Sequence, residues 1–137
     1  MLRHILFWLL YLKNKVVRRH ITFNGFTIIF KFPGCKIELG SGVINSSCTS
    51  NMLGLWQRTI LIARYGGKIK IGDGFGISGT TIYSMESITI GKNVTIGANC
   101  KIVDNDFHPL DKDLRNRGLN KDFAKRKPII IGDDCFI

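Results

Sequence analysis

The sequence predicts an all-β solenoid, in which short strands wind into the stacked coils of a triangular prism. One observation is a tetrapeptide, Ile-Gly-x-(Gly, Asn or Asp), which begins at Ile71, Ile90, Ile96 and Ile131. The other is the recurrence of apolar residues every six positions in two parallel series: Ile82, Ile88, Val94 and Cys100; and Ile90, Ile96 and Ile102. A helix needs spacings near 3.6, which a period of six does not supply.

Each six-residue unit is explained by a short strand followed by a corner. Alternating side chains such as Val94 and Ile96 give two inward contacts per strand. The Gly, Asn and Asp residues that follow tolerate the left-handed backbone of a corner. Three units make one coil, and Ile71 and Ile90 are 19 residues apart, which is one coil and one extra residue. Both series resume at Ile129, Ile131, Cys135 and Ile137.

The pattern divides the chain into three parts. Residues 1–20 are predicted to form a basic amphipathic helix and residues 21–66 degenerate or irregular first coils. Residues 67–137 are predicted to form the hexapeptide-repeat β-helix, with an extruded loop over residues 104–127. The repeat therefore provides the scaffold, and the loop interrupts it.

The two amino-terminal parts carry weaker signals. The apolar run from Ile5 to Leu12 is too short to span a bilayer, which needs roughly 20 residues. With its basic neighbours it would suit a helix lying on an anionic membrane surface, or one packed on its own domain or a neighbouring subunit. Further along, Ile37, Val43 and Thr49 are six residues apart and indicate a degenerate coil.

Charge indicates an anionic partner. The formal net charge is +10, and no acidic residue precedes Glu38. A membrane surface, nucleic acid or a phosphorylated ligand would each fit this asymmetry. We do not expect nucleic acid, because no stacking aromatic residues interleave the basic residues of the loop.

The cysteines do not indicate a metal site. Their spacing contains no CxxC motif, and no paired histidines accompany them: Cys35, Cys48, Cys100 and Cys135. A reduced compartment suits this pattern better than a disulfide framework. Cys100 and Cys135 occupy equivalent repeat positions, so we expect both to be small core residues.

The interruption of the repeat displays one histidine. The segment "DNDFHPLDKDLRNRG", residues 104–118, lies between Ile102 and Ile129, where the six-residue register lapses. Loops on rigid scaffolds are common positions for functional groups. Pro109 fixes its own backbone and biases His108 toward an extended conformation, so the histidine is held in place.

At these motifs the chain resembles the hexapeptide-repeat acyltransferases, a superfamily of left-handed parallel β-helices. The nearest likeness is to the maltose and galactoside O-acetyltransferase branch and to related capsular and lipopolysaccharide O-acetyltransferases. It covers roughly Lys68 to Ile137, and its most specific part is the His-Pro loop followed by "KPIIIGDD". The resemblance implies a left-handed coil and a homotrimer with active sites between neighbouring prisms.

The resemblance also implies a reaction. His108 would be the general base that deprotonates a sugar hydroxyl as it attacks the thioester of acetyl-CoA, without a metal. The acceptor would be a cell-surface polysaccharide or its precursor, at a cytoplasmic location on the inner face of the membrane. Supporting or substrate-binding candidates are Asp104, Asn105, Asp106 and Ser78, and candidates for the CoA phosphates are Lys125, Arg126 and Lys127.

Structural roles compete with these assignments. Asp104 and Asp106 would also serve as corner and loop-capping residues, and Ser78 as an ordinary corner residue. The basic run at Lys125 would also serve as a solvated surface. Arg115 and Arg117 match basic positions of the family's loop, where salt bridges within the loop are expected.

Two departures from the family leave an alternative open. The segment "FGISGTTIYSMES" lacks the aromatic and amide pair of the galactoside branch, so the sugar is unspecified. The chain stops at Ile137 within a coil, where family members continue, so we expect a truncated product or a fragment. The alternative is a catalytically silent β-solenoid that acts as a structural or membrane-surface module. A zinc site of the carbonic-anhydrase type is disfavoured, because His4 and His20 lie far from the repeats.

Overall fold

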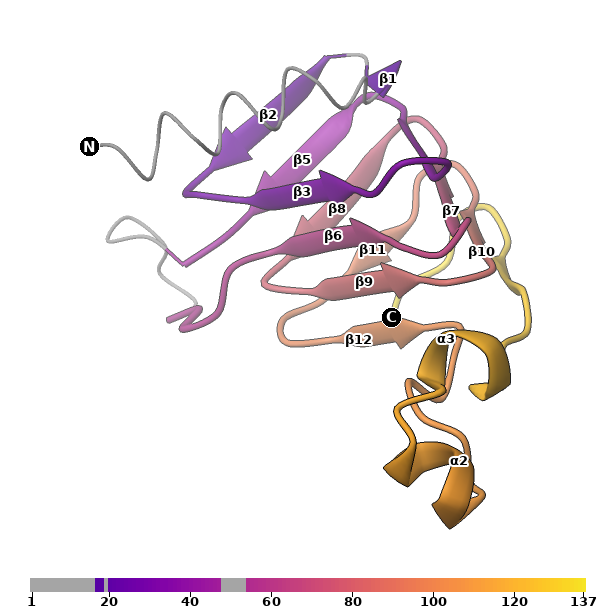
Figure 1. The fold of residues 1–137 in the computed structure, drawn as a ribbon. Coiled ribbons are helices and arrows are strands. Elements are labelled where there is room, and N and C mark those ends of the chain that lie inside the picture. The colour runs from indigo at the N-terminus through magenta and orange to yellow at the C-terminus, as the bar shows by residue number, and fades with distance from the viewer. Residues whose placement is uncertain (1–16, 19, 48–53) are drawn as a thin grey trace.

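The chain winds into stacked three-sided coils. The computed structural model describes residues 17–18, 20–47 and 54–137. Its strands form three parallel sheets, one per side of the prism (Figure 1). Face A contains β1 (Val17–Arg18), β4 (Lys36–Leu39), β7 (Lys68–Ile71), β10 (Ser87–Ile90) and β13 (Ile129–Ile131). Face B contains β2 (Ile21–Asn24), β5 (Gly42–Asn45), β8 (Phe75–Ser78) and β11 (Thr95–Ile96), and face C contains β3 (Ile28–Lys31), β6 (Ile60–Ala63), β9 (Thr81–Ser84) and β12 (Lys101–Val103).

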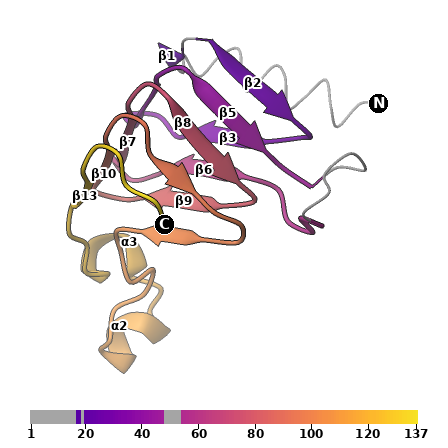
Figure 2. The same ribbon diagram turned by 180° about the vertical axis from the view of Figure 1, so that it is seen from behind.

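The prism is a left-handed parallel β-helix. In Figure 1 the strands of face C lie toward the viewer and run from left to right as the coils descend. The strands of face B lie behind them and run from right to left, and Figure 2 shows them from the other side. A chain that turns in this sense while it descends is left-handed. The predicted fold class is confirmed.

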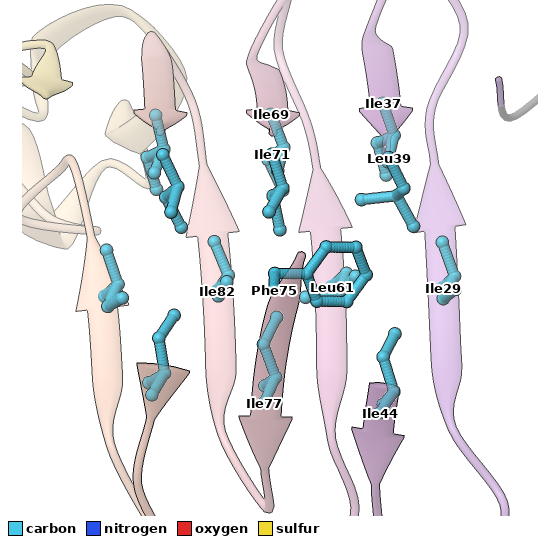
Figure 3. Packing of buried hydrophobic residues seen from close by; sticks show 14 of the residues in the cluster. Ile29, Ile37, Leu39, Ile44, Leu61, Ile69, Ile71, Phe75, Ile77 and Ile82 are labelled. Atoms are coloured by element: carbon cyan, nitrogen blue, oxygen red, sulfur yellow. The ribbon is translucent and has the colours of Figure 1, made fainter. Parts of the chain in front are cut away.

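Inward side chains stack coil upon coil. On face A the register aligns Ile37, Ile69 and Ile88, and all three are buried. Equivalent columns on the other faces are Ile44, Ile77 and Ile96 on face B, and Ile29, Leu61, Ile82 and Ile102 on face C. Figure 3 shows several of these side chains pointing into the prism. Burying each isoleucine or leucine stabilises the coil by about 1.5–3 kcal/mol.

The two six-residue series between Ile82 and Ile102 are confirmed as inward. The aliphatic members of both series are buried, and Cys100 packs against the core as a partly buried residue. Cys135 is also partly buried against the core, and Cys48 lies outside the described residues. The period of six therefore marks the inward positions of this stretch correctly.

The glycine of the Ile-Gly repeat is explained by the closeness of successive coils. A Cβ atom on Gly72 would lie 2.7 Å from the carbonyl carbon of Gly91, and one on Gly91 would lie 2.6 Å from the backbone nitrogen of Asp133. Real Cβ atoms do not approach backbone atoms this closely. The same corner is tied vertically, because the Asp73 carboxylate accepts from Ser41 N at 2.9 Å and the Asp133 carboxylate from Lys92 N at 2.7 Å.

The amino-terminal parts differ from expectation. The helix predicted over residues 1–20 falls mainly outside the described residues, and Val17–Arg18 is a strand, β1, paired with β4. Residues 21–66 contain the strands β2 to β6 of the first coils. The series through Ile37, Val43 and Thr49 is wrong at Val43, which is 38% exposed; Ile44 is the inward residue there. Thr49 lies outside the described residues.

The corner packing predicts a difference between two glycines. Gly72→Ala should lower the free energy of unfolding by about 1–3 kcal/mol, because its Cβ overlaps the backbone of the next coil. Gly76→Ala is the matched control, because its Cβ meets only the Thr95 side chain, at 4.0 Å. Urea denaturation of both variants measures the difference. Equal stability of the two variants would contradict the corner explanation.

Candidate active site

The loop over residues 104–127 leaves the prism where face C meets face A. Two hydrogen bonds close its base: Asp106 N to Lys125 O and Lys127 N to Asp104 O, both at 2.9 Å. Its two short helices, α2 (Lys112–Asn116) and α3 (Asn120–Phe123), project beyond the coils (Figure 1). Neither helix contains a buried residue. The extruded loop is therefore present with the predicted bounds, as an arm fastened at its base.

Asp104 anchors this base. Its side chain is 4% exposed and its carboxylate accepts hydrogen bonds from Ser84 Oγ at 2.6 Å, Met85 N at 2.8 Å and Glu86 N at 2.9 Å. A further bond comes from the Asn105 side-chain amide at 3.1 Å. The oxygens of Asp104 are thus committed to the corner of the coil above and to the start of the loop.

A strained turn positions His108. The backbone N–H of His108 donates to Asp106 O at 2.6 Å, across Phe107, whose φ is +58°. This is a γ-turn with a left-handed central residue, a rare conformation that costs energy for a bulky side chain. Asn105 Oδ1 accepts from Phe107 N at 3.0 Å, and the Phe107 ring packs on Tyr83 with centroids 4.9 Å apart. These contacts hold the turn in place.

Hydrogen bonds also fix the backbone of the residues that follow His108. Pro109 is buried, and Arg115 Nη1 donates to the carbonyls of Pro109 at 3.0 Å and Leu110 at 2.9 Å. Arg115 thus binds main-chain oxygens, where the sequence predicted an ion pair within the loop. Asp111 caps α2 by accepting from Asp113 N and Leu114 N. His108 therefore lies between two fixed points of the backbone.

The imidazole of His108 is open to solvent. His108 is exposed, and within the described residues its ring has no hydrogen-bond partner. Asp104 is occupied with the corner, and Asp106 bonds through its backbone while its carboxylate is exposed. The structure thus brings Asp104, Asn105 and Asp106 to the turn that carries His108, without a carboxylate on the ring.

Ser78 lies at a different corner of the prism. It ends β8, before face C begins, whereas the loop leaves after face C ends. Its hydroxyl accepts from Asn45 Nδ2 at 3.2 Å, and Asn45 Oδ1 accepts from Asn24 at 2.8 Å. Ser78 thus belongs to a polar ladder on face B and is not brought beside His108.

The three basic candidates for the CoA phosphates have different roles. Arg126 is half-buried, and its guanidinium donates to the carbonyls of Met85 at 3.0 Å, Tyr65 at 3.3 Å and Lys121. It binds the end of the loop to the corner between faces C and A, at the residues that follow β6 and β9. Lys125 and Lys127 have exposed side chains, so only these two present their charge at the loop base.

Tyr83 and Phe107 are parts of the site that the motifs and the repeat did not predict. Tyr83 follows the inward Ile82, so strand alternation already indicates that it points outward on face C. Its register partner in the next coil is Val103, directly before the loop, which could have placed it near the histidine. Nothing in the sequence indicated the role of Phe107, because neither the composition nor the repeat period predicts a phenylalanine with a left-handed backbone conformation.

Comparisons with known proteins found no match: no family model matches the chain, and no curated protein or solved structure matches it significantly. The resemblance to acyltransferases therefore stays a prediction. In the part of the chain that the structure describes, no three His, Cys, Asp or Glu side chains cluster as metal ligands. No helix among the described residues has the length and hydropathy to cross a bilayer.

The arrangement can present one imidazole, on a fixed turn, to a polar substrate from solvent. The rigid coils that precede the turn and the bonds at the loop base limit its movement. An exposed imidazole can accept a proton from a hydroxyl that approaches it. Exposed ammonium groups at the loop base can attract an anion.

The anchoring role of Asp104 predicts a contrast with Asp106. Asp104→Asn should lower the free energy of unfolding by about 2–4 kcal/mol, because charge-assisted bonds are lost and buried donors lose their acceptor. Asp106→Asn, at an exposed carboxylate two residues away, should change it by less than about 0.5 kcal/mol. Denaturation with urea compares them. Two equally stable variants would show that Asp104 does not anchor the loop.

Proposed function

We propose that this protein is an acetyl-CoA-dependent O-acetyltransferase that acts on a sugar hydroxyl of a cell-surface polysaccharide or its precursor. The observation that supports this most is the placement of His108. The parallel β-helix extrudes the loop over residues 104–127, and a strained turn at the base of this loop holds the exposed His108. Strain of this kind persists at functional sites when the surroundings maintain it. The type of reaction is inferred from the resemblance of the repeats and the His-Pro loop to the hexapeptide-repeat acyltransferases.

In the proposed reaction, the neutral imidazole of His108 accepts the proton of the sugar hydroxyl. The hydroxyl oxygen forms a bond to the thioester carbonyl carbon, and the resulting tetrahedral oxyanion collapses with cleavage of the carbon–sulfur bond. The protonated imidazole returns the proton to the thiolate. The products are the O-acetyl sugar and CoA, and no covalent enzyme intermediate is needed.

The remaining features support a binding role for the loop base. Lys125 and Lys127 would attract the phosphates of CoA, because both ammonium groups are exposed there. Arg126 serves this role less well, because three main-chain carbonyls already occupy its guanidinium. The resemblance adds a homotrimer with a shared cleft, and the net charge of +10 is compatible with a cytoplasmic protein at the inner, anionic membrane face.

The assignment of His108 predicts the behaviour of two variants. His108→Ala should lower the rate of CoA release in the presence of a sugar acceptor by about 10²- to 10⁴-fold, because it removes the general base. His20→Ala is the matched control, because His20 is also exposed but precedes β2 in the first coil. Thiol release from acetyl-CoA, measured over a panel of glycan precursors, gives both rates.

Circular dichroism of each variant should show an unchanged fold, because His108 is exposed. A His108→Ala protein that transfers acetyl groups at the unmodified rate would refute the proposed base. A loss of activity in both variants would show that the effect is not specific to the turn.

A further inference from the structure

The outer surface of face C is apolar. Its strands alternate, so Leu61 and Ile82 point inward and the residues beside them point outward. Register pairing aligns the outward residues in two columns: Ile28, Ile60, Thr81 and Lys101; and Phe30, Ile62, Tyr83 and Val103. Six of these eight side chains are aliphatic or aromatic, and none is acidic.

The other two faces have mostly polar outer surfaces. Face A presents Lys36, Glu38, Lys68, Lys70, Ser87, Thr89 and Ile130. Face B presents Thr22, Asn24, Val43, Asn45, Gly76, Ser78 and Thr95. Sheets that face water on one side normally carry polar residues there. Face C therefore differs from both in a way that indicates a partner.

Exposed aromatic rings extend this surface at both edges. Where face B meets face C, Trp56 is 77% exposed and Phe26 is 36% exposed. Trp56 lies beside face C because the side chain of the next residue, Gln57, accepts from Lys101 Nζ at 2.9 Å, at the start of β12. Where face C meets face A, Phe107 is 42% exposed. An apolar strip thus crosses face C from one corner to the other.

Basic side chains border this strip. Arg58 lies over the Phe26 ring at 4.9 Å, and Arg64 lies over the Phe32 ring at 5.0 Å. The border has four basic residues in all: Lys31, Arg58, Arg64 and Lys101. Among the described residues, none of these four has a carboxylate as an ion-pair partner. Their charges are therefore available to an anionic partner.

The exposed carboxylates near face C lie beyond its strands. Glu86 follows β9 and Asp106 follows β12, both at the corner with face A. Lys125 and Lys127 are exposed at the base of the loop that leaves from this corner. Basic charge therefore accompanies the two carboxylates there, and the strip with its border carries only apolar, hydroxyl and basic side chains.

Size and charge disfavour a second protein chain as the partner. Four strands of about four residues cover roughly 250 Å², at about 4.8 Å between strands and 3.3 Å per residue. A stable protein interface needs about 800 Å² from each partner. A second copy would also bring like charges together, because the chain carries +10 and its residues 109–124 have four basic against three acidic side chains.

A lipid surface meets neither objection. Its binding strength grows with each apolar side chain that is buried and each basic one that lies near anionic headgroups. Tryptophan and tyrosine rings favour the headgroup region, because each ring system has an apolar body and a polar group. The strip presents both kinds of ring, in Trp56 and Tyr83, among aliphatic side chains.

We propose that face C, together with the corner that carries Trp56, binds the surface of an anionic lipid bilayer. The apolar side chains enter the headgroup boundary, and the basic border pairs with the anionic groups of the lipids. The membrane contact expected from the sequence concerned residues 1–20, whereas this surface is built by the coils themselves.

A bilayer on face C would lie next to the candidate active site. Phe107 packs on Tyr83 of face C with ring centroids 4.9 Å apart, and His108 follows it directly. The consequence for the substrate rests on the proposed function: the acceptor sugar would be one attached to a lipid in the membrane. The membrane contact itself does not depend on the reaction.

Co-sedimentation of the 137-residue chain with vesicles tests the contact. The unmodified chain should bind vesicles made of equal parts of phosphatidylcholine and phosphatidylserine. Binding to phosphatidylcholine alone should be weaker by about tenfold or more, because the attraction of the basic border is lost. Equal binding to both vesicles, or binding to neither, would overturn the proposal.

Neutral substitutions locate the apolar part of the contact. Trp56→Gln with Ile62→Gln should weaken binding about tenfold or more, because two side chains lose their favourable transfer from water. Val43→Gln with Phe136→Gln is the matched control, since both residues lie outward on face B, at 38% and 82% exposure. The control should bind as the unmodified chain does.

Trp56→Gln alone keeps this test independent of folding, because the side chain is 77% exposed. It should weaken binding about threefold or more. Equal binding by the two double variants would contradict the proposal and assign the membrane contact to another part of the chain.

Charge-removing substitutions locate the basic border. Arg58→Gln with Lys101→Gln should weaken binding about tenfold or more, because each basic residue near an anionic surface contributes. Lys68→Gln with Lys70→Gln removes the same charge from face A, where both side chains are exposed, and should weaken binding less than about threefold. Equal weakening by both pairs would show that net charge alone determines binding, against the proposed surface.

Sedimentation velocity distinguishes a second copy from the bilayer. A chain that fails to bind vesicles but self-associates, and loses this association with Ile62→Gln, would replace the lipid surface by a second copy and refute the proposal. None of these measurements uses acetyl-CoA or a sugar acceptor. Vesicle binding without acetyl transfer would therefore overturn the proposed function alone, and acetyl transfer without vesicle binding would overturn only the contact.

Discussion

The buried carboxylate of Asp104 is the interaction on which the candidate site depends. Ala63 and Ser84 occupy the equivalent inward position of the two preceding coils. Where the repeat would place another small side chain, Asp104 bonds the Ser84 hydroxyl and two backbone N–H groups of the corner above. The backbone carbonyl of Asp104 also accepts a hydrogen bond from the backbone N–H of Lys127. Asp104 therefore joins the prism to both ends of the loop.

Rigidity of the coils that precede the loop makes the strained turn possible. Stacked isoleucine columns and glycine corners fix the coils closely, and Asp104 transmits this rigidity to the segment that contains Phe107 and His108. Alone, a phenylalanine at φ +58° would relax. The ring of Tyr83 and the side chain of Asn105 hold it, so the histidine is displayed at a set position. The loop can then carry out chemistry that a mobile histidine would perform poorly.

Repetition explains which parts of this structure the sequence predicts. From Ile71 to Ile102 successive coils have nearly equal lengths, so a period of six identifies the inward residues. In the first coils the spacing changes: Leu39 and Ile44 are only five residues apart, whereas their register partners Ile71 and Ile77 are six apart. A strict six-residue series therefore selects the outward Val43. A period detects regular coils and fails where a corner gains or loses a residue.

The extruded loop was predictable in its location and less so in its contacts. The lapse of register and the His-Pro pair identify the loop and His108. They do not distinguish Asp104, whose carboxylate anchors a corner, from Asp106, whose carboxylate is exposed. Arg126 likewise sits in a basic run but binds carbonyls across the loop base. These distinctions depend on which residues the coils bring together, and that information is absent from local sequence.

Calorimetric titration of acetyl-CoA into the purified chain tests the proposal that the loop of this β-helix is a site of acetyl transfer from acetyl-CoA. We expect saturable binding in the micromolar range that competes with free CoA. A folded protein that releases no heat with acetyl-CoA over that range, and shows no protection of the loop in hydrogen exchange, would contradict it.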